Sequence, residues 1–138
     1  MNAPVRFLGG LAAWALVFLL VMSHATVQAA VVVPFSQWQG TVAAWALGVP
    51  GLPVAVVPSC SGLDAMGLCV AALLAYPRPW PQRALGAAIG VTVLLGANLA
   101  RIGTLAMSVG TAWFDLLHVW IWPGALMAIA LGFAATWW

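Results

Sequence analysis

Charged residues are scarce in this sequence. Its 138 residues include four arginines, two acidic residues and no lysine, so only 4% of the chain is charged, against about 25% in a typical soluble domain. Such a chain cannot cover a soluble globule with polar surface. Hydrophobic residues make up 65% of it, and the mean hydropathy is +1.11. The composition therefore predicts an integral membrane protein whose solvent is the lipid bilayer.

The low net charge and the small number and spacing of the cysteines exclude nucleic-acid binding and a cysteine-based metal site or a disulfide within one helix. A net charge of +2, carried by scattered arginines, excludes a nucleic-acid-binding surface. The cysteines, Cys60 and Cys69, would lie about half a turn out of phase and roughly 13 Å apart along a helix. They therefore form neither a disulfide within one helix nor a metal pair, and we expect no metal and no cofactor. By contrast, nine tryptophans suit anchoring at the membrane interface.

Four apolar runs predict a single all-α domain over residues 1–138 that crosses the membrane about four times. The expected spans are about residues 7–29, 61–76, 84–106 and 119–138. The run at residues 27–29, Val-Gln-Ala, fits a signal-peptide cleavage site, but a retained first helix is the favoured interpretation.

A different pattern follows the first span. Trp38, Val42, Trp45 and Val49 recur at helical spacing among polar residues, which predicts a short helix lying in the interface plane on the outer side. Prolines then interrupt regular structure, and residues 54–57 are expected to be extended as they lead into the segment around Cys60.

The arginines predict the orientation of the bundle in the cytoplasmic (inner) membrane. With a cytoplasmic N-terminus, four spans place Arg6, Arg78 and Arg83 on the inside. The remaining polar residues then fall at the outer, or periplasmic, end. These are Cys60, Asp64, Asn98, Arg101, Asp115 and His118. Arg101 is the exception to the positive-inside pattern, and an arginine at membrane depth indicates a functional site.

Two of these outer segments carry candidate catalytic groups. Ser61 followed by Asp64 has the form of a helix-capping box. It places Cys60 at or just before a helix N-terminus, where free amide groups and the helix dipole favour an anion. Asn98 and Arg101 are three residues apart on one helix face.

The third segment supplies a base. Asp115 and His118 are three residues apart, so a helix would let the carboxylate orient the imidazole. Taken singly, each residue has a plainer explanation: an inert thiol, an arginine at headgroup level, an interfacial histidine. Together, Cys60, His118 and Arg101 supply a nucleophile, a proton acceptor and an oxyanion stabiliser, which is a set for acyl transfer.

These blocks resemble the exosortase/archaeosortase family. The resemblance lies in SCSGL at residues 59–63, NLARI at residues 98–102, and His118 with Gly124 six residues later. It extends over about residues 34–131, and the run at residues 116–122 is most similar to the exosortase H subgroup. Many members of the family are longer, with up to about eight spans, so this chain looks like a minimal core.

The resemblance implies a membrane cysteine protease or transpeptidase. Its substrates would be exported proteins with a C-terminal sorting signal made of a short motif, a transmembrane helix and a basic tail. It implies Cys60 as nucleophile, His118 as base and Arg101 as oxyanion or substrate contact, with Ser61, Asn98 and Asp115 in support. The loop before Cys60 is short, so substrate docking could require a partner protein or a homo-oligomer.

Two other functions compete with this interpretation. A non-catalytic membrane subunit in protein export or envelope assembly would use the small residues near Gly90 and Gly96 for helix packing, and it would not need Cys60. A small transporter or channel component built around Arg101 would need a polar path, yet the inner half of each expected span has almost no polar residues.

Overall fold

The computed structural model describes residues 3–137, and in this part of the chain all regular structure is helical. The elements are α1 (Ala3–Ser23), α2 (Ala25–Val27), η1 (Gln28–Val32), α3 (Val33–Leu47), η2 (Pro58–Cys60), α4 (Leu63–Ala75), α5 (Trp80–Ser108), α6 (Phe114–Leu116), η3 (Leu117–Ile121) and α7 (Trp122–Thr136). The all-α prediction is confirmed.

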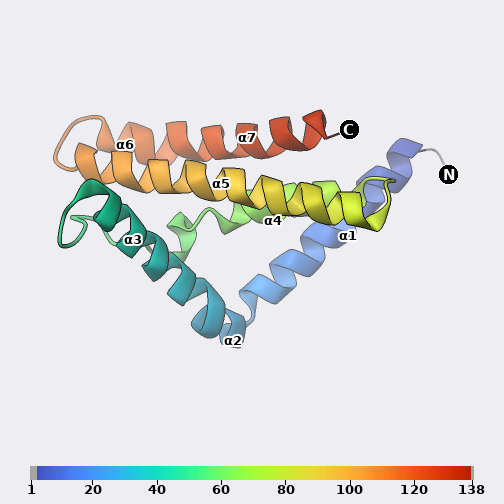
Figure 1. The fold of residues 1–138 in the computed structure, drawn as a ribbon, viewed down its shortest axis with the longest axis horizontal. Coiled ribbons are helices and arrows are strands. Elements are labelled where there is room, and N and C mark those ends of the chain that lie inside the picture. Colours follow the sequence, from blue (N-terminus) through green and yellow to red (C-terminus); the bar gives the residue numbers. More distant parts are fainter. Residues whose placement is uncertain (1–2, 138) are drawn as a thin grey trace.

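Helix α4 lies at the centre of the bundle and packs against α1, α5 and α7. In Figure 1, α5 and α7 run side by side in opposite directions, while α1 and α3 diverge from this layer and meet at α2. The buried core consists of small and aliphatic side chains. Leu73, Leu94 and Ala130 are at most 1% exposed. Cys69 is part of the same core, and its sulfur would lie 2.8 Å from a Cβ placed at Gly90.

Three helices are long and apolar enough to cross a membrane: Pro4–Ser23, Trp80–Ser108 and Phe114–Thr136. Helix α4 is apolar but has only 13 residues. Its rise of about 20 Å is shorter than the roughly 30 Å of a hydrocarbon core. Three helices are therefore candidate spans by length and composition, while a fourth span at α4 and an interfacial position for α3 stay predictions.

The first helix ends earlier than the sequence pattern suggested. It stops at Ser23 rather than near residue 29, because His24 adopts an extended backbone (φ −68°, ψ 131°). The His24 ring accepts a hydrogen bond from the Thr26 amide (3.3 Å), so the histidine caps a second helix that starts at Ala25. That helix continues through η1 to Leu47. The predicted short helix after Pro34 is thus the end of a longer one.

Two π-helical turns, η1 and η3, each stand just before a proline, at Pro34 and Pro123. Proline cannot donate a backbone hydrogen bond, and its ring crowds the carbonyl one turn earlier. A wider π turn relieves that crowding without ending the helix. Both prolines therefore lie inside continuous helices, and the second π turn contains His118.

The arginines fall into two groups along the bundle. Arg6 and Arg83 line one cavity between α1 and the α4–α5 loop. Arg83 donates hydrogen bonds to the backbone carbonyls of Leu74 (2.9 Å) and Arg78 (2.6 Å). Three arginines thus gather at one end of the bundle, whereas Arg101 lies about 27 Å further along α5 by helical rise from residue 83.

Candidate functional site

The segment around Cys60 is a tight turn that leads into α4. Residues 58–60 form a single 3₁₀ turn in which the Cys60 amide donates to the Val57 carbonyl (2.8 Å). The Ser61 hydroxyl donates to the Pro58 carbonyl (2.6 Å) and accepts from the Leu63 amide (3.4 Å). These bonds fix the thiol just before the helix, half-buried rather than sealed in the core.

The predicted capping box does not form. The residue that caps α4 is Gly62, with left-handed backbone (φ 72°) and no side-chain cap. The reason is the 3₁₀ turn: it ties the Ser61 hydroxyl to Pro58, so Ser61 does not cap the helix through the Asp64 amide. Asp64 is exposed in the first turn of α4. Cys60 does precede the helix N-terminus, as expected, but the left-handed glycine makes the connection.

A buried amide network holds this turn against two helices. Asn98 on α5 donates to the Cys60 carbonyl (3.1 Å) and to the Gln39 side-chain oxygen (2.5 Å). Gln39 on α3 donates in turn to the Ser61 carbonyl (3.0 Å). Gln39 and Asn98 are fully buried. The network thus connects α3, the Cys60 turn and α5, and it includes Asn98, which was expected from the sequence to support Cys60.

The network leaves no room beside Gly62. A Cβ at this position would lie 2.9 Å from the Asn98 side-chain carbon Cγ, and the backbone is in the left-handed region that only glycine adopts freely. Both constraints act on the same residue. Gly62 therefore allows the Cys60 turn to approach α5 closely enough for Asn98 to reach the Cys60 carbonyl.

Cys60 and His118 line one cavity of about 260 Å³. Its other walls are apolar. They are formed by Val54, Ala55, Val56, Val57, Ile102, Leu105 and Phe114. The two reactive side chains come from segments 58 positions apart in the sequence, so their meeting is a result of the fold. The structure thus brings together the predicted nucleophile and the predicted base.

His118 is oriented by a ring rather than by a carboxylate. Its imidazole stacks on Phe114, with ring centroids 5.6 Å apart and an interplanar angle of 11°. Asp115 is exposed, and within residues 3–137 it forms no ion pair or hydrogen bond with His118. The predicted Asp115–His118 pair is therefore absent from the structure. The imidazole Nδ1 is buried and has no hydrogen-bond partner among the described residues.

Arg101 lies one helical turn beyond Asn98 on α5 and is only 6% exposed. Its neighbour Ile102 lines the Cys60–His118 cavity, but Arg101 does not. The guanidinium Nε is buried without a hydrogen-bond partner among the described residues. A buried arginine without a protein partner is costly. Arg101 thus lies near the cavity, and its Nε–H donates no hydrogen bond to the described residues.

Gln39 belongs to the candidate site but was not predicted from the sequence. Its position on the predicted interfacial helix gave it no assigned role, and only the packing of α3 against α5 shows that it is fully buried. The available signal was an amide side chain within a helix otherwise rich in small and apolar residues. Such a residue faces water or a buried polar partner; here it faces Asn98 and Ser61.

Replacing Gln39 with leucine should loosen the Cys60 turn. The change leaves the Ser61 carbonyl without its donor and Asn98 without one of its two acceptors, at a cost of about 1–3 kcal/mol. We expect a lower thermal midpoint in detergent and altered alkylation of Cys60 by iodoacetamide. Gln37→Leu is the matched control, because Gln37 is an exposed glutamine on the same helix. Equal effects of the two changes would show that the network does not hold the turn.

Comparison with known proteins identifies one curated relative. The chain is 32% identical over 72 residues to Archaeosortase A of Haloferax volcanii. The match covers 52% of this chain and 24% of that protein, so the chain spans about a quarter of the curated relative. Neither a protein-family model nor a solved structure matches the chain. The similarity supports a relationship to the exosortase/archaeosortase family and leaves the exosortase H subgroup as a prediction.

Proposed function

We propose that this protein is a membrane cysteine peptidase or transpeptidase that processes other membrane-anchored proteins. The observation that carries the proposal is the shared cavity of Cys60 and His118. A thiol and an imidazole facing one apolar space are the nucleophile and base of thiol-dependent acyl transfer. The partial similarity to an archaeosortase supports the same class of activity.

The proposed reaction proceeds through a thioester. The Cys60 sulfur attacks the carbonyl carbon of the scissile peptide bond while His118 accepts the thiol proton. The carbonyl oxygen becomes an oxyanion, and the proposed stabilising cation is Arg101, which lies outside the cavity lining but next to Ile102 in its wall. When the C–N bond breaks, His118 returns the proton to the departing amine, and the N-terminal part of the substrate stays on Cys60. Water or an acceptor amine then releases it as an acid or an amide.

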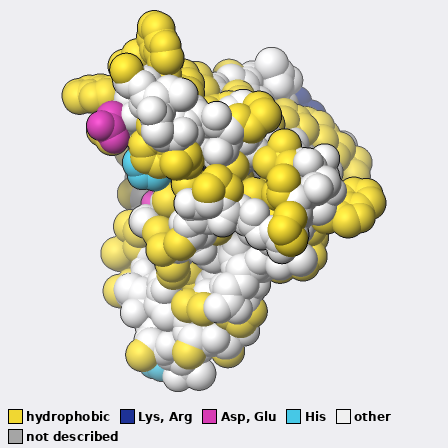
Figure 2. Space-filling view, turned by 90° about the vertical axis from the view of Figure 1, so that its left-hand side faces the viewer, with side chains coloured by type: hydrophobic (Ala, Val, Ile, Leu, Met, Phe, Trp, Pro, Cys, Tyr) yellow, Lys and Arg dark blue, Asp and Glu magenta, His cyan; other side chains and the backbone are white. Residues whose placement is uncertain are grey.

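The proposed substrate class rests on the resemblance to the exosortase/archaeosortase family, and the place of the cavity in the bundle supports it. Figure 2 looks onto the end of the molecule where α5 meets the loop to α6. Hydrophobic side chains are spread over that face, acidic and histidine side chains lie at its left edge, and arginine appears only at its margin. With the arginine-rich end inside, this face is the outer one. We propose exported proteins as substrates, cleaved between a folded domain and a C-terminal sorting signal of a short motif, a transmembrane helix and a basic tail.

The base assignment is tested by His118→Ala. The proposal expects processing of a co-expressed protein with such a C-terminal signal to fall by about 10²–10⁴-fold. Added imidazole should restore part of the rate, because the truncated side chain leaves space beside Phe114 in the cavity. Asp115→Asn should process normally, since Asp115 does not contact the ring in the structure. An unaffected His118→Ala protein would remove His118 from the mechanism.

A further inference from the structure

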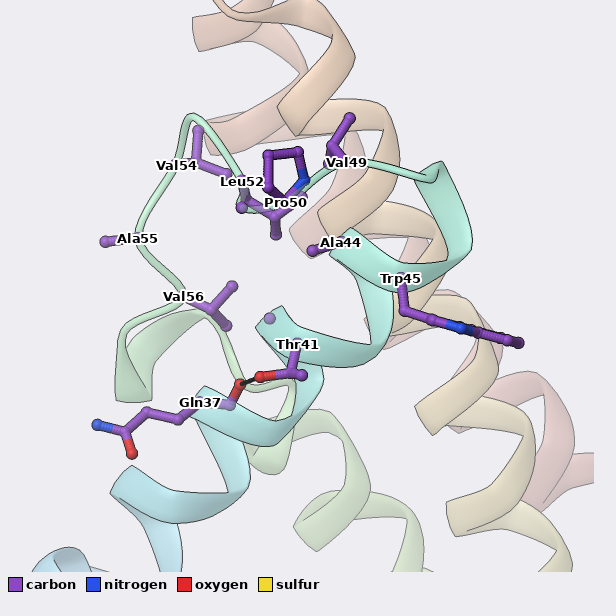
Figure 3. Close-up of a pocket in the computed structure, with 12 residues that line it drawn as sticks. Gln37, Thr41, Ala44, Trp45, Val49, Pro50, Leu52, Val54, Ala55 and Val56 are labelled. Atoms are coloured by element: carbon purple, nitrogen blue, oxygen red, sulfur yellow. Dashed lines mark hydrogen bonds between the residues drawn. The ribbon is translucent and has the colours of Figure 1, made fainter.

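A second, larger hollow lies next to the Cys60–His118 cavity. It has a volume of about 640 Å³ and lies between α3 and the loop that follows it. We name it the loop groove. It is lined by Gln37, Gly40, Thr41, Ala44, Trp45, Val49, Pro50, Gly51, Leu52, Val54, Ala55 and Val56. Figure 3 shows the loop arching away from α3 and returning past Val56, whose side chain points back towards the helix.

The loop wall of the groove is free of helix and leads into the extended residue Val57. Half-buried Val54 and Val56 alternate with exposed Ala55 and Val57, which is the period-two pattern of a strand. The Val57 backbone is itself extended (φ −88°, ψ 163°). Opposite this wall, α3 presents Gly40, where a Cβ would lie 3.3 Å from Val56. A side chain at that position would press against the returning loop.

The loop wall has unused hydrogen-bonding groups. The backbone groups of residues 54–56 form no hydrogen bond with any other part of residues 3–137. At the edge of a sheet, such a row of N–H and C=O groups pairs readily with a second extended chain. The described residues contain no strand, so the backbone groups of residues 54–56 are available to another polypeptide.

The groove is continuous with the candidate site. Residues 54–56 line both the loop groove and the Cys60–His118 cavity, one on each side of this segment. A polypeptide paired with this segment would therefore lie beside the thiol. None of the residues that line the groove is charged, so a charged side chain entering it would lose water without gaining a partner.

We propose that the loop groove binds an extended, uncharged segment of the substrate polypeptide next to the scissile bond, through backbone pairing with residues 54–56. This inference rests on the proposed function and adds to it the mode of substrate recognition. Main-chain hydrogen bonds supply affinity, and the uncharged hollow between α3 and the loop selects uncharged side chains. The volume is in the range of about 300–1,000 Å³ typical of ligand sites.

Filling the groove should weaken substrate binding and leave the reactivity of the Cys60 thiol unchanged. The variant is Thr41→Trp, at an exposed groove position. Thr92→Trp is the matched control, because Thr92 is also exposed and also bonds the carbonyl one turn earlier in its helix. The probe is a tagged exported protein from the same genome that ends in a short motif, an apolar helix and a basic tail. Thr41→Trp should raise its KM by at least about tenfold with little change in kcat.

A second variant tests the backbone pairing. Ala55→Pro removes an N–H from the loop wall and should also raise KM. Alkylation of Cys60 by iodoacetamide should proceed at the wild-type rate in both variants, which shows that the turn is intact. A wild-type KM in both variants, or an effect of Thr92→Trp as large as that of Thr41→Trp, would overturn the proposal.

Cross-linking separates this proposal from the enzymatic one. With p-benzoylphenylalanine at position 41 and Cys60→Ala to prevent turnover, the tagged probe should cross-link within a few residues of its cleavage site. Cross-linking only to lipid, or only to the probe's apolar helix, would contradict the groove assignment even if processing requires Cys60. Conversely, specific cross-linking in a protein whose processing survives Cys60→Ala would support the groove and refute the cysteine mechanism.

Discussion

Cys60→Ala should abolish processing of an exported protein that carries the C-terminal signal. The thiol is the atom that forms the covalent bond, and removing an enzyme nucleophile costs several orders of magnitude in rate. We expect a loss of at least about 10³-fold, measured as release of the C-terminal fragment from cells that co-express both proteins. The fold should survive, because Cys60 is only half-buried and its amide and carbonyl make the local hydrogen bonds.

Cys69→Ala is the control for this result. Cys69 lies in the core of the bundle, away from the Cys60–His118 cavity, and the loss of one sulfur there affects packing rather than chemistry. Processing by Cys69→Ala at a rate within a few fold of the wild type is expected. If Cys60→Ala processes as well as Cys69→Ala, the protein is better explained as a non-catalytic subunit.

Arg101→Met should separate catalysis from stability. The guanidinium has a buried Nε without a partner among the described residues, so its replacement by an apolar chain of similar length removes no Nε hydrogen bond and should not destabilise the bundle. If Arg101 binds the developing oxyanion, processing should fall by about 10²–10³-fold. The measurement is the processing rate together with the thermal midpoint in detergent.

Arg101→Lys distinguishes charge from geometry. Lysine keeps the positive charge but lacks the planar, forked donors of arginine. We expect its rate to fall between those of wild type and Arg101→Met, with an unchanged midpoint. A large fall in the midpoint of Arg101→Met with a preserved rate per folded molecule would assign Arg101 a structural role instead.

Much of the architecture could be predicted because lipid imposes a simple rule. Apolar runs must form helices whose backbone groups are paired internally, so hydropathy located α5 and the α6–α7 helix well. Helix ends were harder to predict. The break at His24 depends on a backbone conformation at one residue, and the continuation through Pro34 and Pro123 depends on π turns that hydropathy does not report.

The reactive side chains of the candidate site could be predicted from the sequence. The residues that contact and position them could not. Polar and nucleophilic residues are rare in such an apolar chain, so the sequence itself identifies the candidates Cys60, Asn98, Arg101 and His118. Their partners depend on tertiary packing. Gln39 becomes part of the site because α3 packs against α5. Asp115 is outside it because its side chain is exposed and does not line the cavity that His118 lines.

The proposed mechanism requires a thioester intermediate between Cys60 and the substrate, and hydroxylamine can trap this intermediate. Hydroxylamine cleaves thioesters, so processing in its presence should release the N-terminal part of the substrate as a C-terminal hydroxamate, identified by mass spectrometry. The account predicts this product with the wild-type protein and its absence with Cys60→Ala. Continued cleavage without hydroxamate, or hydroxamate formed equally by Cys60→Ala, would contradict it.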